Sequence, residues 1–208
     1  MNISCKAEPF ARRLRVRRDG AYAMFEARTK PITAEAFIAF TLRPENEGRH
    51  FELIDGEIVE KMPTQLHALI ANLFNAVLYI YFRSHPIGWA FSELRINLPN
   101  DDLNDTIPDI SMVLKAGRQL DPNEPLTFMP DLAIEIKSPT DSLIKMRQKA
   151  NYYLENGSKV VWLVDTQRQK VEVYTVDDTE ILGSSDTLDG GDLLPDFKLP
   201  VSDLWTQS

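Results

Sequence analysis

The pattern of apolar and polar residues predicts one long helix and several short strands. From Gln65 to about Ser84, apolar side chains recur every three or four residues, which is the spacing of a helix with one wide apolar face. Residues 51–54 and 57–60 flank Asp55-Gly56. Because Asp-Gly tolerates the positive φ of a tight turn, these segments predict a β-hairpin. Residues 160–164 are all apolar, as expected of a strand covered on both faces.

Shorter patterns predict the remaining elements. One helix is expected at residues 33–40, and another is expected from a cap at Asp141 to about Asn156, where Gly157 suits the C-terminal turn. Alternating or apolar segments predict further strands at residues 92–98, 107–114, 130–139 and 171–176. This order predicts an α+β fold in which helices flank a mixed central sheet, with a β-hairpin near the N-terminus.

The two ends of the chain differ in charge. The run from Arg12 to Arg18 is too basic to pack in a core, so residues 1–29 are predicted to be a basic, disordered N-terminal arm. Residues 30–208 suit one domain with a sizeable core. A translation start at Met24 would also explain the pattern, as would an arm that grips nucleic acid. We favour the tail or the later start, because basic runs are common.

The net charge of −8 conceals an acidic body. Residues 1–30 carry eight Lys and Arg against three Asp and Glu, whereas the rest of the chain carries fifteen against twenty-eight. An acidic body does not favour avid binding of nucleic acid, which relies on basic groups that meet phosphates. This charge counts against a nuclease without excluding one, because metal ions neutralise a carboxylate-rich site.

Composition also bears on the compartment. Cys5 is the only cysteine, so the chain has no disulfide framework, and a reducing cytoplasm fits. No apolar stretch follows Met1 as it would in a signal peptide. The apolar window from residue 66 to residue 82 is short for a membrane span and is interrupted by polar residues. We therefore expect a cytoplasmic protein without a membrane span.

Charged residues interrupt the predicted central strand. Side chains alternate along a strand, so Ala133, Glu135 and Lys137 should share one face. Burying a carboxylate and an ammonium there is costly unless they are paired or bind metal. Asp109 follows Pro108 in the preceding strand, as Asp131 follows Pro130 in the central one. If the two strands pair, Asp109 can meet Glu135 and Lys137 on one face.

These residue types suit the hydrolysis of a phosphodiester. The reaction needs an activated water and stabilisation of the charge that grows on the phosphate, and Mg²⁺ or Mn²⁺ with oxygen ligands can supply both. Asp109 and Glu135 would provide two carboxylates, and the carbonyl of Ile136 could provide a third oxygen. Lys137 would orient the water or stabilise the transition state.

This layout resembles the PD-(D/E)xK, restriction-endonuclease-like superfamily and, within it, the Uma family of restriction-endonuclease-like proteins. The resemblance extends from Pro31 to about Leu204 and is carried by these residues: 51–59, His67, Pro108-Asp109, 130–135, Ser138-Pro139, Lys149, Tyr153, Gly157 and 162–165.

The resemblance implies a restriction-endonuclease-like fold, DNA as the substrate and a homodimer. It implies an active site at Glu52, Asp109, Glu135 and Lys137, and it matches His67 to a histidine at the start of the family's long helix. Members of the family often have an apolar residue where this chain has Lys137. Lys149 could take over its role if Lys137 does not point inward.

Each candidate also has a purely structural explanation. Asp109 could cap a turn after Pro108, and Glu135 with Lys137 could form a structural ion pair. Glu57 shares a face of the hairpin with Glu52 and could replace it. A lone histidine such as His67 is often structural. Tyr153, which lies four residues after Lys149, suits a core position with a bonded hydroxyl better than a catalytic one.

Two functions of different classes remain. The first is a Mg²⁺-dependent nuclease that cuts DNA, and the second is a nuclease-fold binding or assembly module without useful activity. The intact Asp, Glu and Lys favour the first, whereas the acidic body favours the second. A protease or esterase finds no support, because there is no Gly-x-Ser-x-Gly elbow and no Cys/His pairing. The three histidines lack the spacing of zinc ligands.

Overall fold

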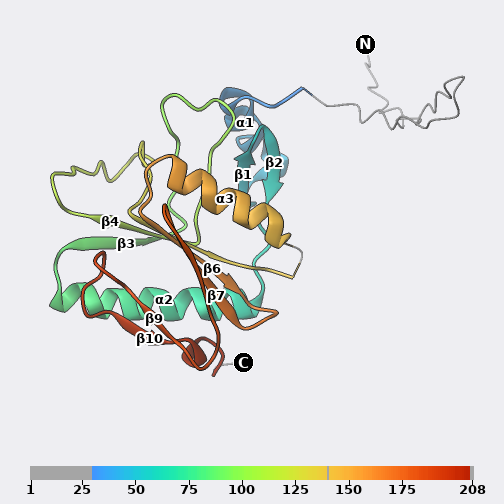
Figure 1. Cartoon of the computed structure of the whole chain (residues 1–208). Coiled ribbons are helices and arrows are strands. Elements are labelled where there is room, and N and C mark those ends of the chain that lie inside the picture. The colour runs from blue at the N-terminus through green and yellow to red at the C-terminus, as the bar shows by residue number, and fades with distance from the viewer. Residues whose placement is uncertain (1–29, 140, 207–208) are drawn as a thin grey trace, which may run out of the picture. The chain divides into compact units, whose positions relative to one another are not determined.

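A six-stranded mixed sheet forms the centre of the computed structural model, which describes residues 30–139 and 141–206 (Figure 1). Only β5 and β6 run parallel, and all other neighbours are antiparallel. The mixed sheet predicted from the sequence is thereby confirmed. In spatial order the strands are β3 (Gly88–Ser92), β4 (Ile110–Leu114), β5 (Leu132–Ile136), β6 (Val160–Asp165), β7 (Lys170–Thr175) and β8 (Thr179–Leu182).

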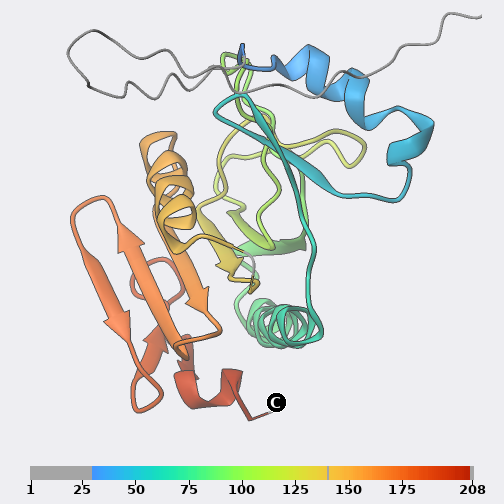
Figure 2. The ribbon, with the colours of Figure 1, turned by 90° about the vertical axis from the view of Figure 1, so that its right-hand side faces the viewer.

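Two helices cover opposite faces of this sheet (Figures 1 and 2). The long helix α2 (Gln65–Ser84) matches the predicted range, and α3 (Leu143–Glu155) connects β5 to β6. Along β5, Leu132, Ile134 and Ile136 belong to the core cluster on the α2 face, whereas Ala133 belongs to the cluster on the α3 face. The alternation predicted for this strand is therefore present, and it directs Glu135 toward α3.

The predicted hairpin forms beside α3 and lies outside the central sheet. Strands β1 (Phe51–Ile54) and β2 (Glu57–Glu60) pair antiparallel around a turn in which Asp55 and Gly56 both have positive φ. A Cβ atom at Gly56 would lie 2.6 Å from the Cβ of Pro31, so this turn requires glycine. The short helix α1 (Ala34–Thr41), which Thr33 caps, and the turn η1 (Pro44–Asn46) precede the hairpin.

The C-terminal segment completes the core on the α2 face. It contains the two-stranded sheet of β9 (Thr187–Asp189) and β10 (Lys198–Pro200), followed by the turn η2 (Val201–Leu204). Phe197 stacks on Trp162 with ring centroids 5.8 Å apart, and Trp162 also contacts Phe74 of α2. These contacts link the end of the chain to the sheet and to α2.

Helix α2 is the one helix among the described residues that is long and apolar enough, by length and composition, to cross a bilayer. It lies along the sheet and buries His67, Ile70, Phe74, Leu78 and Tyr81. This packing gives the apolar face a role within the fold.

Two local predictions were wrong. The strand expected at residues 92–98 does not form. Strand β3 ends at Ser92, and Glu93 adopts a positive φ and turns the chain. Ile96 then makes isolated bridges with Thr106 and Leu126. Helix α3 takes Ser142 as its N-cap residue, whereas Asp141 accepts a hydrogen bond from the backbone N–H of Ser138. The predicted arm, residues 1–29, lies outside the described residues.

Candidate functional site

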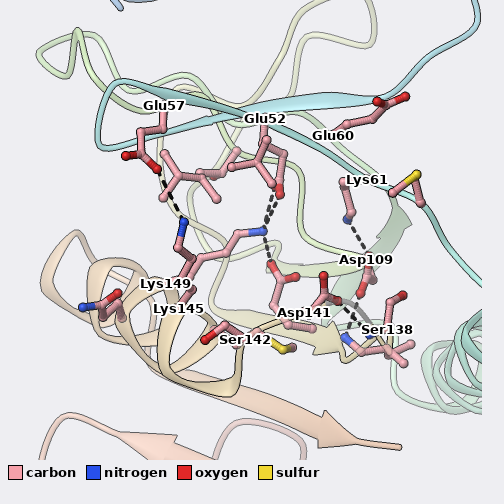
Figure 3. A pocket seen from close by; sticks show the side chains of 18 of the residues that line it. Glu52, Glu57, Glu60, Lys61, Asp109, Ser138, Asp141, Ser142, Lys145 and Lys149 are labelled. Atoms are coloured by element: carbon pink, nitrogen blue, oxygen red, sulfur yellow. Dashed lines mark hydrogen bonds and ion pairs between the residues drawn. The ribbon is translucent and has the colours of Figure 1, made fainter. Parts of the chain in front are cut away.

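A pocket of about 600 Å³ lies between the hairpin, α3 and the ends of two central strands (Figure 3). Of the four predicted active-site residues and the further candidate His67, all but Lys137 line it, and so do Ile136 and Lys149. Five separate segments of the chain contribute these side chains, so the site exists only in the folded protein.

Asp109 immediately precedes β4 and is buried at the bottom of the pocket. Its Oδ2 accepts a hydrogen bond from the backbone N–H of Ile136 at 2.7 Å, and the Nε2 of His67 lies 3.0 Å from the same oxygen. Its Oδ1 lies 2.5 Å from the Nζ of Lys61. Burial alone would raise the pKa of Asp109, but the hydrogen bond from His67 and the charge of Lys61 outweigh it and hold that pKa well below its usual range.

Glu135 projects from β5 toward α3. Its Oε1 accepts a hydrogen bond from the hydroxyl of Tyr153 at 2.8 Å and lies 2.8 Å from the Nζ of Lys149. Burial raises the pKa of Glu135, and the ammonium of Lys149 opposes this shift while the charge of Asp109 adds to it. The two predicted metal-binding carboxylates therefore differ, because Asp109 is strongly acidic and Glu135 holds its proton more readily.

Glu52 of β1 reaches across the pocket to α3. Both of its oxygens accept hydrogen bonds from Lys149, at 2.7 and 2.9 Å, and Oε1 also accepts one from the backbone N–H of Ile107 at 2.5 Å. Burial would lower the pKa of Lys149, but Glu135 and Glu52 reverse that effect and raise it. Lys149 is thus a buried, charged ammonium that joins two carboxylates. Between the two hairpin candidates, Glu52 faces this cluster, whereas Glu57 lies at the exposed rim and pairs with Lys145.

Lys137 does not join the cluster, contrary to our expectation from strand parity. Strand β5 ends at Ile136. The Nζ of Lys137 donates hydrogen bonds to the side chain of Gln167 at 3.1 Å and to the backbone carbonyl of Ser138 at 3.3 Å. Side chains alternate between the two faces only while the backbone remains a strand. Because β5 ends one residue before Lys137, the alternation no longer directs this side chain toward Glu135. Lys149, the alternative considered from the sequence, contacts Glu135 instead.

Lys61 is a member of the site that we did not predict. It follows β2 directly, and its ammonium contacts Asp109 and donates to the backbone carbonyl of Ile107 at 2.8 Å. Burial would lower its pKa, but the charges of Asp109, Glu135 and Glu52 raise it, so the side chain stays protonated. The only sequence signal was a lysine one residue beyond the hairpin that carries Glu52.

The donor set fits magnesium better than zinc. Among the described residues, no three His, Cys, Asp or Glu side chains form a cluster that could hold a metal ion. A structural zinc site would need such a cluster, whereas Mg²⁺ is commonly held by one or two carboxylates, with water and phosphate oxygens completing its shell. Asp109 and Glu135 supply two hard oxygen donors in one pocket, which Ile136 also lines.

Comparisons with known proteins point to a nuclease family. A family model named Uma2, described as "Putative restriction endonuclease", matches residues 34–202. Among solved structures, the chain is similar to "a putative nuclease belonging to DUF820" from Anabaena variabilis. The two share 29% identity with a TM-score of 0.71, over 84% of this chain and 97% of the other. No curated protein matches the sequence.

Proposed function

Because the chain belongs to the Uma2 family of putative restriction endonucleases, we propose that it is a Mg²⁺- or Mn²⁺-dependent endonuclease that cuts DNA. The observation that carries this proposal is the placement of Asp109 and Glu135 in one pocket, with the ammonium of Lys149 bound to Glu135. Two carboxylates can hold a divalent cation, and a fixed ammonium can stabilise the charge that grows on the phosphate during hydrolysis.

The proposed metal site consists of Asp109, Glu135 and the backbone carbonyl of Ile136. A divalent cation bound there would activate water and neutralise the charge that grows on the phosphate. His67 and the N–H of Ile136 fix the carboxylate of Asp109, and Tyr153 fixes that of Glu135. These contacts orient both carboxylates in advance of binding, which reduces the cost of ordering them.

Lys149 takes the role that the motif would give to Lys137. Its ammonium is held by Glu52 and Glu135 at the inner wall of the pocket (Figure 3). A fixed, buried cation stabilises negative charge strongly, because little reorganisation is needed during the reaction. Glu52 positions this lysine and need not contact the metal.

A binding or assembly module is the second candidate, and the charge of the molecule favours it. The chain from residue 31 onward carries fifteen Lys and Arg against twenty-eight Asp and Glu. Acidic side chains, including Glu57, Glu60 and Asp141, also line the pocket. Nucleic acid would meet repulsion at such a surface, so an enzyme of this kind would depend on its metal ion for substrate affinity.

We further propose that the protein acts as a homodimer in a reducing cytoplasm. Cys5 is the only cysteine, which suits that compartment. Helix α2 presents exposed apolar side chains on the face opposite to the core, among them Leu69, Tyr79 and Ile80. A second copy of the chain could cover them.

The decisive experiment compares the purified protein with Glu135→Gln on plasmid, linear and single-stranded DNA in the presence of Mg²⁺ or Mn²⁺. We expect the unaltered protein to cut DNA and Glu135→Gln to lose most of that activity, because one negative ligand is gone. Glu57→Gln, at the exposed rim, is the matched control and should cut normally. Equal cleavage by all three proteins would indicate a contaminating nuclease. No cleavage by any of them would favour the binding module.

A further inference from the structure

The two oxygens of Asp109 have different surroundings. Oδ2 is held by the backbone N–H of Ile136 and by His67, which is itself buried on the first turn of α2. The N–H belongs to the backbone of β5, and the side chain of His67 is only 7% exposed. Oδ1 is contacted by the flexible side chain of Lys61 at 2.5 Å. Oδ1 is therefore the oxygen that can change its partner.

Lys61 is placed so that it can move. It follows the last residue of β2, and its side chain is 15% exposed, compared with 7% for Lys149. Met62, the next residue, is an exposed part of the pocket rim. The second hydrogen bond of Lys61 goes to a single backbone carbonyl, that of Ile107. Lys149, in contrast, bonds to two carboxylates from different elements and lies deeper.

A divalent cation that binds Oδ1 would compete with the ammonium of Lys61, because both oxygens of Asp109 already have partners. At Glu135, by contrast, Lys149 and Tyr153 both contact the same oxygen, Oε1. Mg²⁺ binds carboxylate oxygens at about 2.0–2.1 Å, and the ammonium of Lys61 already lies within hydrogen-bond distance of Oδ1 of Asp109. Near a protein surface, two cations at such a separation repel each other several times more strongly than in bulk water. The repulsion favours withdrawal of the ammonium, which has the more flexible attachment.

We propose that Lys61 is a built-in counter-ion of Asp109, which an incoming divalent cation must displace from Oδ1. This inference rests on the proposed metal-dependent function. In the ion-free protein, Lys61 neutralises a buried carboxylate that would otherwise be costly. Its presence lowers the affinity for metal, and its displaced ammonium moves toward the pocket rim beside Met62. Lys61 is thus a positioning residue that sets the metal affinity.

Calorimetric titration with Mn²⁺ tests the proposal. Lys61→Met should bind Mn²⁺ at least about tenfold more tightly than the unaltered protein, because a full charge no longer competes; tenfold corresponds to about 1.4 kcal/mol. Lys61→Gln, which retains a hydrogen-bond donor without the charge, should also bind more tightly. Lys137→Met is the matched control, since Lys137 is buried outside the pocket, and its affinity should be unchanged. Equal or weaker binding by both Lys61 variants would overturn the proposal.

A second measurement uses the unaltered protein and does not depend on folding of the variants. Amine-reactive labelling followed by mass spectrometry reports how accessible each lysine is. Saturating Mg²⁺ should increase the labelling of Lys61 several-fold and leave that of Lys149 unchanged. If calorimetry shows bound metal and the labelling of Lys61 is unchanged or reduced, the proposal that metal displaces Lys61 is overturned. The proposed nuclease function would not be affected by that result. If neither the unaltered protein nor any variant binds metal, both proposals fail.

Discussion

Buried charges in the pocket stabilise one another through direct ion pairs. Lys149 would lose much of its hydration in the protein, yet Glu135 and Glu52 raise its pKa and keep it charged. In turn, its ammonium satisfies oxygens of both carboxylates. A buried ion cluster of this kind depends on every member, because removing one leaves an uncompensated charge.

Replacing Lys149 by Met should therefore affect both stability and activity. Leaving Glu52 and Glu135 without their cation should cost about 3–5 kcal/mol in the free energy of unfolding, measured by urea denaturation. Cleavage of DNA should also be lost under conditions in which the variant is still folded. Lys137→Met removes a buried lysine that contacts Gln167 and should retain cleavage. The opposite result, with Lys137 essential and Lys149 dispensable, would restore the motif lysine to the active site.

At the level of single residues, the sequence predicted the carboxylates better than the lysines. The pocket contains Asp109 and Glu135, as strand parity and a shared Pro-Asp opening predicted. A carboxylate on a buried strand is conspicuous because its burial is costly. Lysines have long side chains that reach a site from many backbone positions. Lys61 and Lys149 approach from the hairpin end and from α3, which local pattern alone could not establish, although the family resemblance suggested Lys149.

At the level of elements, local signals predicted structure where the interactions are local. The Asp55-Gly56 turn and the helical spacing of residues 65–84 gave the correct bounds of the hairpin and of α2. Residues 93–98 alternate like a strand, but their partners are distant in sequence. Ile96 bridges Thr106 on one side and Leu126 on the other, so tertiary context decides their conformation.

Helix α3 is tied to the sheet by a second ion pair, away from the pocket. Arg147 of α3 donates to both oxygens of Glu172 on β7, at 2.6 and 2.9 Å, and the hydroxyl of Tyr174 donates to Glu172 at 2.8 Å. Burial would raise the pKa of Glu172, but the hydrogen bonds from Arg147 and Tyr174 outweigh it and lower the pKa. The ionised form of Glu172 therefore stabilises the fold.

This shift predicts a pH-dependent effect of Glu172→Gln. A carboxyl whose pKa is lower in the folded state binds fewer protons there, so its stabilising contribution is present above the unfolded pKa of about 4.3. It disappears as the pH falls through the lower, folded value. Urea unfolding should show Glu172→Gln to be less stable than the unaltered protein at pH 7, and this difference should be smaller at pH 3. An equal stability loss at both values would show that the contribution of Glu172 does not depend on its charge.

At the level of the whole molecule, charge is unevenly distributed, and α2 has one charged residue, in its last turn. Between Gln65 and Phe82 the helix contains no Asp, Glu, Lys or Arg, although the chain from residue 31 onward is strongly acidic. Its outward side chains include Ile80, which is 66% exposed, and Tyr79, which is 65% exposed. Leu69, Leu73, Ala76 and Ile80 follow one another at intervals of four, three and four residues, which is the seam spacing of paired helices.

A second copy of the chain is the occupant that best fits this seam. Helices that lie on a membrane surface have Lys and Arg along their polar face, and α2 has only Arg83, in its last turn. A surface that binds DNA needs positive charge to meet the phosphates. Two acidic copies, in contrast, would repel each other least where both are neutral, and the same apolar stripe on each copy makes a two-fold contact self-complementary.

The proposed dimer can be tested by sedimentation velocity on the full-length protein. We expect a dimer whose dissociation is promoted by Ile80→Glu, because the change places a charge in the seam of both copies at once. The exposed position of Ile80 means that the monomer should keep its thermal midpoint. Ile181→Glu, at an exposed isoleucine on β8, is the matched control and should remain dimeric. A monomeric unaltered protein, or a dimer indifferent to Ile80→Glu, would show that α2 is not the contact between copies.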